Sequence, residues 1–160
     1  MSDEAFVNAS PLILLARIGQ LDLLKLAGSP VRAPLQVRDE VAAKGSTDIV
    51  VSAMARAPWL EPSGLAPIPA DIRLRNLGAG EAAVLSASRF ASATAILDDL
   101  QARQCALDLG VKHIGTLGLV LRARQRGVLP RAKPVVEALL AAGMYLSPAM
   151  VRETLRIAGE

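Results

Sequence analysis

Aromatic residues are scarce in this sequence: two Phe, one Trp and one Tyr occur among 160 residues. The apolar share is nevertheless 52%, supplied mainly by Ala, Leu and Val, so the sequence predicts an aliphatic core. Such a share excludes a mainly disordered chain. The length predicts a single domain over residues 1–160, with room for a substantial core.

Cysteine and histidine occur once each, as Cys105 and His113. One cysteine excludes a disulfide framework within the chain. Because only one cysteine and one histidine are available, a zinc site and Cys-His or Ser-His-Asp catalysis are not favoured either. No uncharged apolar run reaches about 18 residues, so we expect no membrane-spanning helix and no membrane partner. The acidic start, MSDEAF, argues against a secretory signal, and we expect a cytoplasmic protein.

Glycine-rich phosphate-binding loops are also missing. The sequence contains neither a GxGxxG nor a GxxxxGKS/T pattern, so it gives no support to a nucleotide-binding loop. The net charge of +3 is mildly basic, which permits a nucleic-acid partner but does not establish one.

Short apolar segments alternate with helical patterns along the chain. We expect strands near residues 5–7, 31–35, 59–60, 93–97 and 111–114. We expect helices near residues 12–18, 21–26, 36–44, 47–57, 81–90, 100–109, 117–126, 132–142 and 148–158, with N-caps that include Ser10 and Thr116. This alternation predicts an α/β fold of three layers, in which helices cover both faces of a mainly parallel sheet of about four or five strands and further helices close the chain.

Polar residues stand directly after two of the predicted strands. Asp98 and Asp99 follow the strand at 93–97, and Asn8 follows the strand at 5–7. Ligands of open parallel sheets gather at the carboxyl ends of the strands, where paired acids suit a hard divalent cation. Alternatively, the two acids cap the next helix and Asn8 is a turn residue. The sequence leaves both interpretations open.

Two further acids lie on predicted helices. Glu40 stands one step from the apolar face of its helix, where an acid can point into a cleft or into solvent. Glu81 begins a helix after Gly78 and Gly80, which we expect to break the chain. Carboxylates that converge on one site repel each other unless a cation joins them. Together with Asn8 and the acid pair, these residues therefore point to a metal-dependent hydrolase.

The same positions resemble the PIN-domain family, metal-dependent ribonucleases that include many VapC-type toxins. Residues 6–13 (FVNASPLI) resemble the first strand and turn of that family, which usually carries Asp where Asn8 stands. Residues 37–40 and Glu81 resemble its second and third acidic positions, and residues 96–99 (ILDD) follow Glu81 at the customary spacing. Arg103 and residues 114–118 (IGTLG) resemble a largely uncharacterised PIN subfamily, and the resemblance extends from about residue 5 to residue 158.

This resemblance implies a PIN-like fold that hydrolyses RNA phosphodiester bonds with Mg²⁺ or Mn²⁺ as cofactor. The acids that it implies as catalytic are Glu40, Glu81, Asp98 and Asp99. The implied metal ligands are the same acids and Asn8, and the implied substrate-binding residues are Ser10, Arg103 and Thr116. Counting from Glu81 favours Asp99 as the ligand of the pair, whereas proximity to the strand end favours Asp98.

Other functions fit parts of the pattern. Because Asn8 lacks the charge of Asp, a catalytically weakened PIN fold that only binds RNA or a protein is the main alternative. A small-molecule α/β enzyme is a third possibility, for which the sequence shows no pocket motif.

The expected partners are RNA, a second copy of the chain and a small antitoxin protein. The resemblance implies a toxin that forms a homodimer and is inhibited by an antitoxin, which would place an Arg or Lys among Glu40, Glu81 and Asp99. The helical stretches 135–140 and 144–150 carry more apolar residues than the covering of one small sheet requires, which favours an interface. Alternatively, both stretches pack on the core of their own chain.

Overall fold

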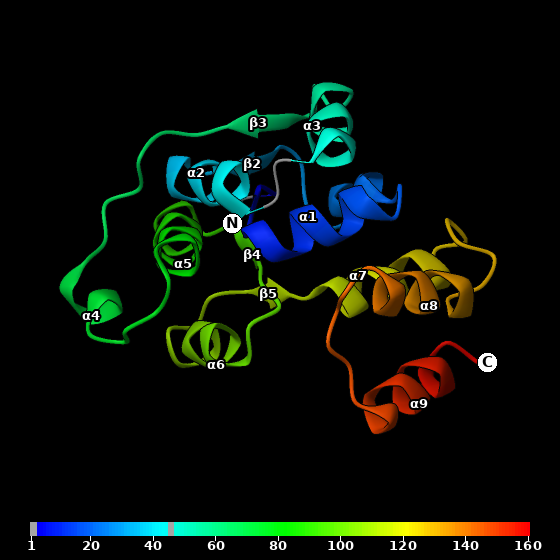
Figure 1. The fold of residues 1–160 in the computed structure, drawn as a ribbon. Helices are drawn as coiled ribbons and strands as arrows, with labels where there is room; N and C mark the ends of the chain where they lie inside the picture. Colours follow the sequence, from blue (N-terminus) through cyan, green and yellow to red (C-terminus); the bar gives the residue numbers. More distant parts are fainter. Residues whose placement is uncertain (1–2, 45–46) are drawn as a thin grey trace.

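The structure, a computed structural model, describes residues 3–44 and 47–160. In this part of the chain, five short strands form a parallel sheet in the order β3-β2-β1-β4-β5. The strands are β1 (Ala5–Val7), β2 (Val31–Ala33), β3 (Leu60–Pro62), β4 (Thr94–Ile96) and β5 (His113–Ile114). Helices flank the sheet (Figure 1), so the predicted α/β fold with a parallel sheet of four to five strands is confirmed.

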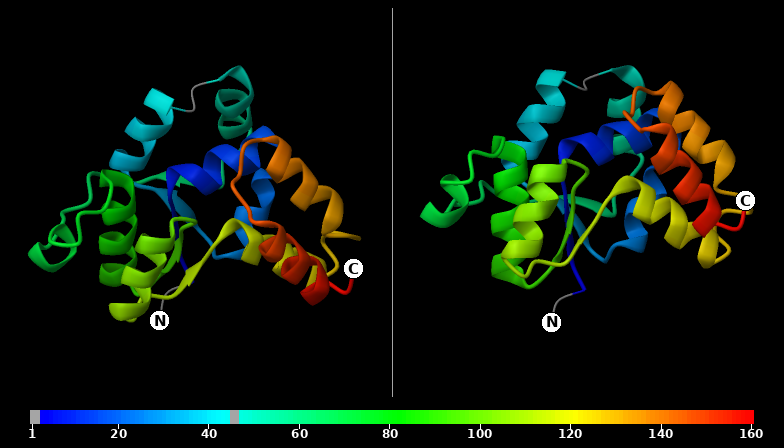
Figure 2. Two further views of the ribbon diagram at one scale, coloured as in Figure 1. Left: turned by 60° about the horizontal axis from the view of Figure 1, so that its bottom comes forward. Right: turned by 90° about the horizontal axis from the view of Figure 1, so that it is seen from below.

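Most of the helices fall where the apolar periodicity predicts them. Between β1 and β4 they are α1 (Ala9–Arg17), the 3-10 helix η1 (Leu21–Leu26), α2 (Leu35–Lys44), α3 (Asp48–Ala55), α4 (Ala70–Arg73) and α5 (Ala79–Ala91). After β4 they are α6 (Leu100–Asp108), α7 (Thr116–Gln125), α8 (Lys133–Ala141) and α9 (Pro148–Ile157). The last three lie together at one side of the molecule, where α7 contacts both α8 and α9 (Figure 2). Within the described residues, none of these helices combines the length and the apolar character needed to cross a membrane.

The sheet is buried, and its core is aliphatic as predicted. All residues of the central strand β1 are buried, which fits a parallel sheet covered on both faces. The largest fully buried side chains include Leu12, Leu85 and Leu119, which come from helices rather than from the sheet. Cys105 is also buried, on α6, and burial raises the pKa of its thiol, so it packs as a small apolar residue.

The strand order places a topological switch point between β1 and β4. From β1 the chain proceeds outward to β2 and β3, and then returns to β4 on the other side of β1. Asn8 follows β1 and Asp98 follows Leu97 beyond β4, so both stand at the same end of neighbouring strands. The backbone N–H of Asn8 donates a hydrogen bond to the backbone carbonyl of Ile96 at 3.1 Å, which holds the two strand ends together. Ligands of open parallel sheets bind at such a point.

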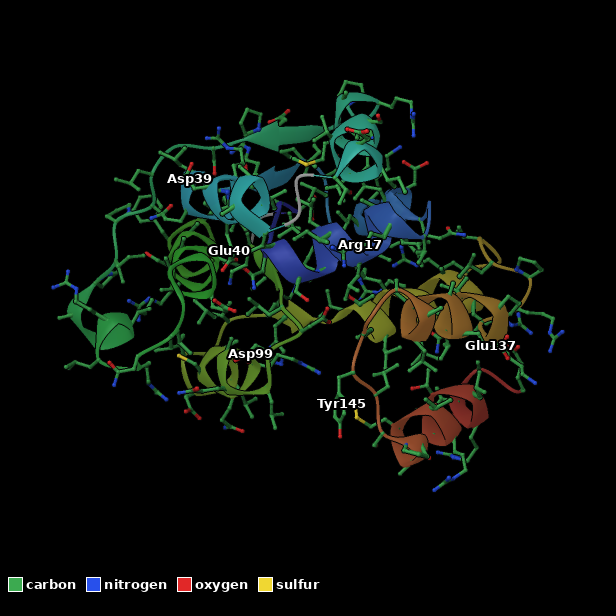
Figure 3. The ribbon with its side chains drawn as sticks, in the orientation of Figure 1. Arg17, Asp39, Glu40, Asp99, Glu137 and Tyr145 are labelled. Atoms are coloured by element: carbon green, nitrogen blue, oxygen red, sulfur yellow. The ribbon has the colours of Figure 1, made fainter. Side chains whose placement is uncertain are left out.

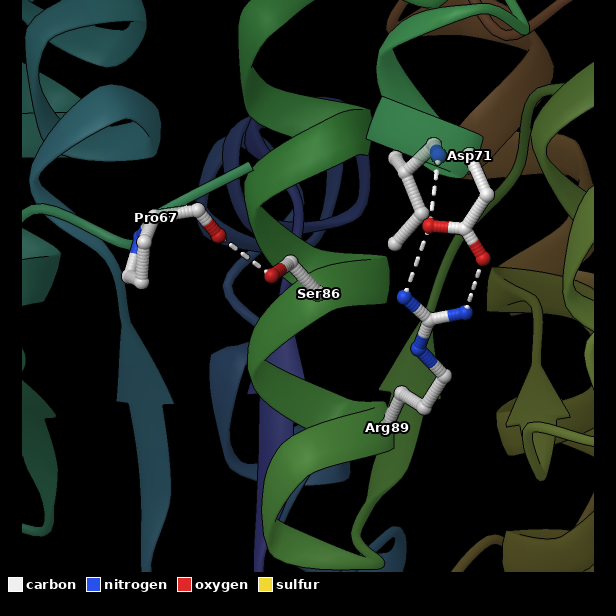
Figure 4. A network of polar contacts seen from close by, with 5 residues as sticks. Pro67, Asp71, Ser86 and Arg89 are labelled. Carbon is white, nitrogen blue, oxygen red and sulfur yellow. Dashed lines mark hydrogen bonds and ion pairs between the residues drawn. The ribbon is translucent and has the colours of Figure 1, made fainter. Parts of the chain in front are cut away.

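Polar contacts fix α5 against the segment that precedes it (Figure 4). Arg89 donates two hydrogen bonds to the carboxylate of Asp71, one of them at 3.0 Å, and lowers the pKa of that carboxyl. The Ser86 hydroxyl donates to the carbonyl of Pro67. The prolines and glycine between residues 61 and 71 predict a loop, and the end of this segment forms the start of the short helix α4. These contacts anchor the helix that carries Gly80 and Glu81.

Three local predictions are wrong. The first helix begins at Ala9 with Asn8 rather than Ser10 as its N-cap, because the Asn8 backbone already has the extended conformation of a cap (φ −83°, ψ 165°). Gly115 rather than Thr116 is the N-cap of α7, since Thr116 is itself the first helical residue. Gly80 lies inside α5 instead of breaking the chain. Gly45 as a helix end and Ser46 as a helix start lie outside the described residues.

Candidate functional site

A cleft of about 790 Å³ opens at the carboxyl end of the sheet, beside the switch point. It brings together seven of the eight side chains predicted for the site from the sequence: Asn8, Ser10, Glu40, Glu81, Asp98, Asp99 and Arg103. They come from strand ends and from helices α1, α2, α5 and α6, and Figure 3 shows Glu40 and Asp99 among them. The eighth, Thr116, is fully buried and does not line the cleft.

Asn8 holds an oxygen that the protein leaves unsatisfied. Its side chain is 2% exposed, and Oδ1 accepts no hydrogen bond from any described residue. An Asn at an N-cap commonly accepts a hydrogen bond from the first turn of its helix, but Asn8 makes no such side-chain bond. A buried acceptor without a donor is costly. The oxygen is therefore available to a ligand that carries positive charge or a proton.

Gly80 allows Asn8 and Glu40 to pack closely against α5. A Cβ on Gly80 would lie 2.7 Å from Asn8 Oδ1 and 3.0 Å from Glu40 Oε2, which is too close for a side chain, so both oxygens lie against this glycine. Gly80 is buried in the first turn of α5, where Ala would be a better helix former. An amide oxygen and a carboxylate oxygen in one neighbourhood are a donor set that suits a hard divalent cation.

Asp98 is held by Thr116. Its Oδ1 accepts a hydrogen bond from the Thr116 amide at 2.7 Å, and its Oδ2 accepts one from the Thr116 hydroxyl at 2.6 Å. These bonds join the end of β4 to the start of α7. Thr116, predicted to contact substrate, therefore fixes the orientation of an acid of the cleft instead.

Asp99 caps the helix that follows it. Its Oδ2 accepts a hydrogen bond from the Ala102 amide at 2.9 Å, as the capping interpretation of the acid pair predicts. The side chain is exposed and lines the cleft, so its second oxygen remains accessible. Asp98 and Arg103 both approach Gly115: an atom placed as Cβ there would stand 3.1 Å from Asp98 Oδ1 and 3.7 Å from an Nη of Arg103.

The remaining acids each have a neighbour of their own. Glu40 forms an ion pair with Lys44 at 3.5 Å, and the carboxylate of Glu81 folds back over Gly78. In residues 3–44 and 47–160, no three His, Cys, Asp or Glu side chains are close enough together to form a metal site. The feature that fits a cation is the orphaned Asn8 oxygen, which lies against the same glycine as an oxygen of Glu40.

The other half of the cleft is apolar and was not predicted from the sequence. It is lined by Ile13, Leu117, Leu121, Met144, Tyr145 and Met150, and Arg17 lies on the same wall as Ile13. Met144 and Tyr145 come from the connection between α8 and α9, which is far in the sequence from the strand ends. The sequence analysis singled out the apolar stretch 144–150, but as a helix and an interface; residues 144–147 instead belong to the connection before α9.

Replacing Asn8 with Asp should strengthen cation binding and weaken the bare fold. The new carboxylate adds a charge at contact distance from the cation, which should tighten Mn²⁺ binding by roughly tenfold or more. Without a cation it is a buried charge beside Glu40, so the melting temperature in EDTA should fall. Calorimetric Mn²⁺ titration and thermal melting of both forms measure the two effects. Equal or weaker Mn²⁺ affinity in N8D would place Asn8 outside the cation site.

Comparisons with known proteins address the family of the chain. A family profile described as a PIN domain matches residues 5–160. Among solved structures, the chain is similar to a PilT N-terminus domain protein from the hyperthermophilic archaeon Sulfolobus solfataricus P2, with 12% sequence identity, coverage of 90% of this chain and 97% of that chain, and a TM-score of 0.47. No curated protein matches the chain. Because the profile spans nearly all of the sequence, the chain belongs to the PIN-domain family, whose members are generally nucleases.

Proposed function

We propose that this protein is a ribonuclease that depends on Mg²⁺ or Mn²⁺. The observation that carries the proposal is the unsatisfied, buried Oδ1 of Asn8, which lies against Gly80 together with an oxygen of Glu40. It stands at the switch point of the sheet, in a cleft lined by three further acids, and the chain belongs to a family of nucleases. Each of these facts is consistent with phosphodiester hydrolysis at this end of the sheet.

The residues present fit a divalent cation. Asn8 Oδ1 and Glu40 would hold it directly, and Glu81, Asp98 and Asp99 lie in the same cleft as further carboxylate ligands. A bound Mg²⁺ or Mn²⁺ would lower the pKa of a water ligand and offset the negative charge of a phosphate.

The protein's own side chains orient an acid of the cleft and supply positive charge for a phosphate. Thr116 holds Asp98 in one orientation through two hydrogen bonds, so this carboxylate need not be ordered when the substrate arrives. Arg103 lines the same cleft as Asp98 and can pair with a phosphate oxygen, and the exposed Ser10 lines the cleft from the first turn of α1. We propose these two side chains as substrate contacts.

Cleavage of RNA with and without metal tests the proposal. Purified protein should cleave RNA in Mg²⁺ or Mn²⁺ and lose this activity in EDTA. Glu40→Gln should reduce cleavage by at least about tenfold, because it removes a charge beside the proposed cation. Asp39→Asn is the matched control: Asp39 is the exposed neighbour of Glu40 on α2 and does not line the cleft (Figure 3). Cleavage that persists in EDTA, or that E40Q leaves intact, would reject the proposal.

The second candidate function is binding of RNA without cleavage. It is favoured by Asn8, which is neutral and contributes no negative charge to a cation site. Fewer negative charges around a cation weaken its binding. RNA binding without cleavage in either metal would support this candidate.

We further propose that the protein is a toxin that forms a homodimer and binds a small antitoxin with an Arg or Lys near Glu40, Glu81 and Asp99. The chain's own core covers part of the apolar surface expected at an interface, since Val135, Val136 and Leu139 of α8 are buried. Leu140 and Met150 remain exposed, at 37% and 47%. Light scattering on the purified chain tests the homodimer, and a monomer at tens of micromolar counts against it.

A further inference from the structure

A second cavity, of about 770 Å³, opens at the opposite end of the sheet from the acid cleft. Its lining includes residues that precede or begin four strands: Asp3 before β1, Ser29 before β2, Thr94 at the start of β4 and Lys112 before β5. In the described part of the chain, no residue lines both this cavity and the acid cleft. The amino ends of the strands therefore form a hollow of their own, with a volume in the usual range of small-molecule pockets.

Positive charge gathers on the walls of this hollow, which we call the basic cavity. Among the described residues that line it, four are cationic and Asp3 is the only acid. The cations come from three parts of the chain: Lys25 of η1, Lys112 before β5, and Arg122 and Arg126 at the C-terminal end of α7. Like charges that the fold brings together around a hollow repel each other, and an anion between them offsets that repulsion. The basic cavity therefore favours an anionic ligand.

The two arginines are arranged to contact such a ligand. Arg122 and Arg126 stand four residues apart, on one face of the helix, where like charges destabilise it. Arg122 Nη1 donates a hydrogen bond to the Leu26 carbonyl at 2.9 Å, which positions the guanidinium and leaves its other N–H groups for a ligand. Arg126 is exposed, and its side chain forms no ion pair or hydrogen bond among the residues that the structure describes. The dipole of α7 favours a cation at this end, but it does not explain the two lysines on other segments.

Lys25 is held at the cavity and keeps its attraction for an anion. Its Nζ lies 3.6 Å from a carboxylate oxygen of Asp22 and 5.0 Å from the centre of the Trp59 ring. The side chains of the ion pair are 50% and 80% exposed, so water screens the pair strongly. The contact with the ring limits where the ammonium group can move without removing its charge.

The basic cavity also has an apolar part, formed by Leu26, Leu107, Val111 and Ile114. Leu107 is 65% exposed, although it stands in the last turn of α6 beside the buried core. Pockets for small molecules combine apolar side chains with a few charged or polar groups. A nucleic-acid backbone instead binds along a stripe or face of positive charge. The hollow shape and the mixed lining therefore favour a small molecule over a nucleic-acid strand.

We propose that the basic cavity binds a small organic molecule with two or more phosphate groups, of the class of a nucleoside diphosphate. Arg122 and Arg126 bind phosphate oxygens through their guanidinium groups, and Lys25 and Lys112 offset the remaining negative charge. The apolar part receives the organic portion of the ligand. Side chains supply the positive charge here, so the site needs no glycine-rich loop, and it is separate from the cleft proposed for RNA cleavage.

Calorimetric titration with ADP in buffer without divalent cations measures this binding. Under these conditions the carboxylates of the acid cleft repel an anion, so ADP should bind at the basic cavity. Arg126→Ala should weaken ADP binding by about tenfold or more, as loss of a charge-assisted contact does, and Arg126→Glu should weaken it further. Arg152→Ala is the matched control, because Arg152 is an exposed cation of α9 that lines neither cavity. It should bind ADP like the wild type.

Two further measurements define the ligand and its location. Inorganic pyrophosphate should bind more weakly than ADP, because it has no organic portion to contact the apolar part of the basic cavity. In NMR spectra, ADP should shift the backbone amide signals of Ser29, Gly110 and Lys112, which line the basic cavity, and leave those of Asn8 and Asp98 in place. Melting curves of the variants show whether each is folded.

Several results would overturn the proposal. They are wild-type protein that binds no ADP at about 1 mM, R126A that binds ADP normally, and R152A that loses as much affinity as R126A. Pyrophosphate that binds as tightly as ADP, or signals that shift at Asn8 and Asp98 instead, would also contradict it. RNA binding that depends on Arg126, in a protein that binds no ADP, would assign the basic cavity to a nucleic-acid backbone instead. Loss of RNA cleavage by the wild type would leave ADP binding unaffected, so the two proposals fail separately.

Discussion

Alanine at position 80 should strongly reduce metal-dependent cleavage while leaving the protein folded. The added methyl group would stand 2.7 Å from Asn8 Oδ1 and 3.0 Å from Glu40 Oε2, so it would displace the two oxygens that we propose as cation ligands. Alanine favours the helix by about 1 kcal/mol over glycine, which offsets part of the crowding. We expect Mn²⁺ affinity and cleavage to fall by roughly 100-fold.

Two measurements separate the loss of the site from the loss of the fold. Calorimetric titration measures the affinity for Mn²⁺. Circular dichroism with thermal melting in EDTA measures whether the protein is folded and how stable it is. Gly64→Ala is the control, because a Cβ at Gly64 meets no described atom within 4 Å. A G80A protein that binds Mn²⁺ and cleaves RNA like the wild type would show that no cation sits beside Asn8.

Removal of the Asp98 side chain should destabilise the fold as well as inactivate it. Asp98→Ala leaves the amide and the hydroxyl of Thr116 without acceptors, in a residue that is 0% exposed. Each unsatisfied buried group costs about 1–3 kcal/mol, so the free energy of unfolding should fall by roughly 3 kcal/mol. Urea denaturation in EDTA measures this loss.

Asp98→Asn separates the structural role of this residue from its charge. The amide oxygen can accept from the Thr116 amide, and the amide nitrogen can donate to the Thr116 hydroxyl, so the fold should be retained. Cleavage should still fall, by about tenfold or more, since a carboxylate of the cleft is lost. An active D98N protein would mean that Asp98 only fixes α7, and the ligand of the acid pair would then be Asp99.

The sequence predicts the location of the site better than its details. Asn8 and Asp98 follow apolar strands, and the carboxyl ends of adjacent parallel strands share one edge of a sheet, so their approach could be predicted. Gly80 could not be interpreted in this way. In the sequence a glycine before Glu81 indicates a break, and only the packing of α5 against Asn8 and Glu40 shows that the missing Cβ lets their oxygens approach the helix closely.

Two other residues show why sequence patterns do not predict all the side chains in and around the cleft. Thr116 fits the pattern of a helix cap, but its hydroxyl bonds to Asp98, 18 residues earlier in the chain. Tyr145 has no sequence neighbour among the acids and meets their cleft only because α8 and α9 pack against α7. Contacts between distant segments determine where both side chains lie, whereas apolar periodicity gives information only about residues that are near in the sequence.

Crystals of the protein soaked in Mn²⁺ test the central claim most directly, because the anomalous signal of manganese locates the ion without reference to activity. We predict an anomalous difference peak within coordination distance of Asn8 Oδ1 and Glu40, and no such peak in crystals of G80A. Manganese bound elsewhere in the cleft, with Asn8 Oδ1 still unliganded and RNA cleavage intact, would contradict the account.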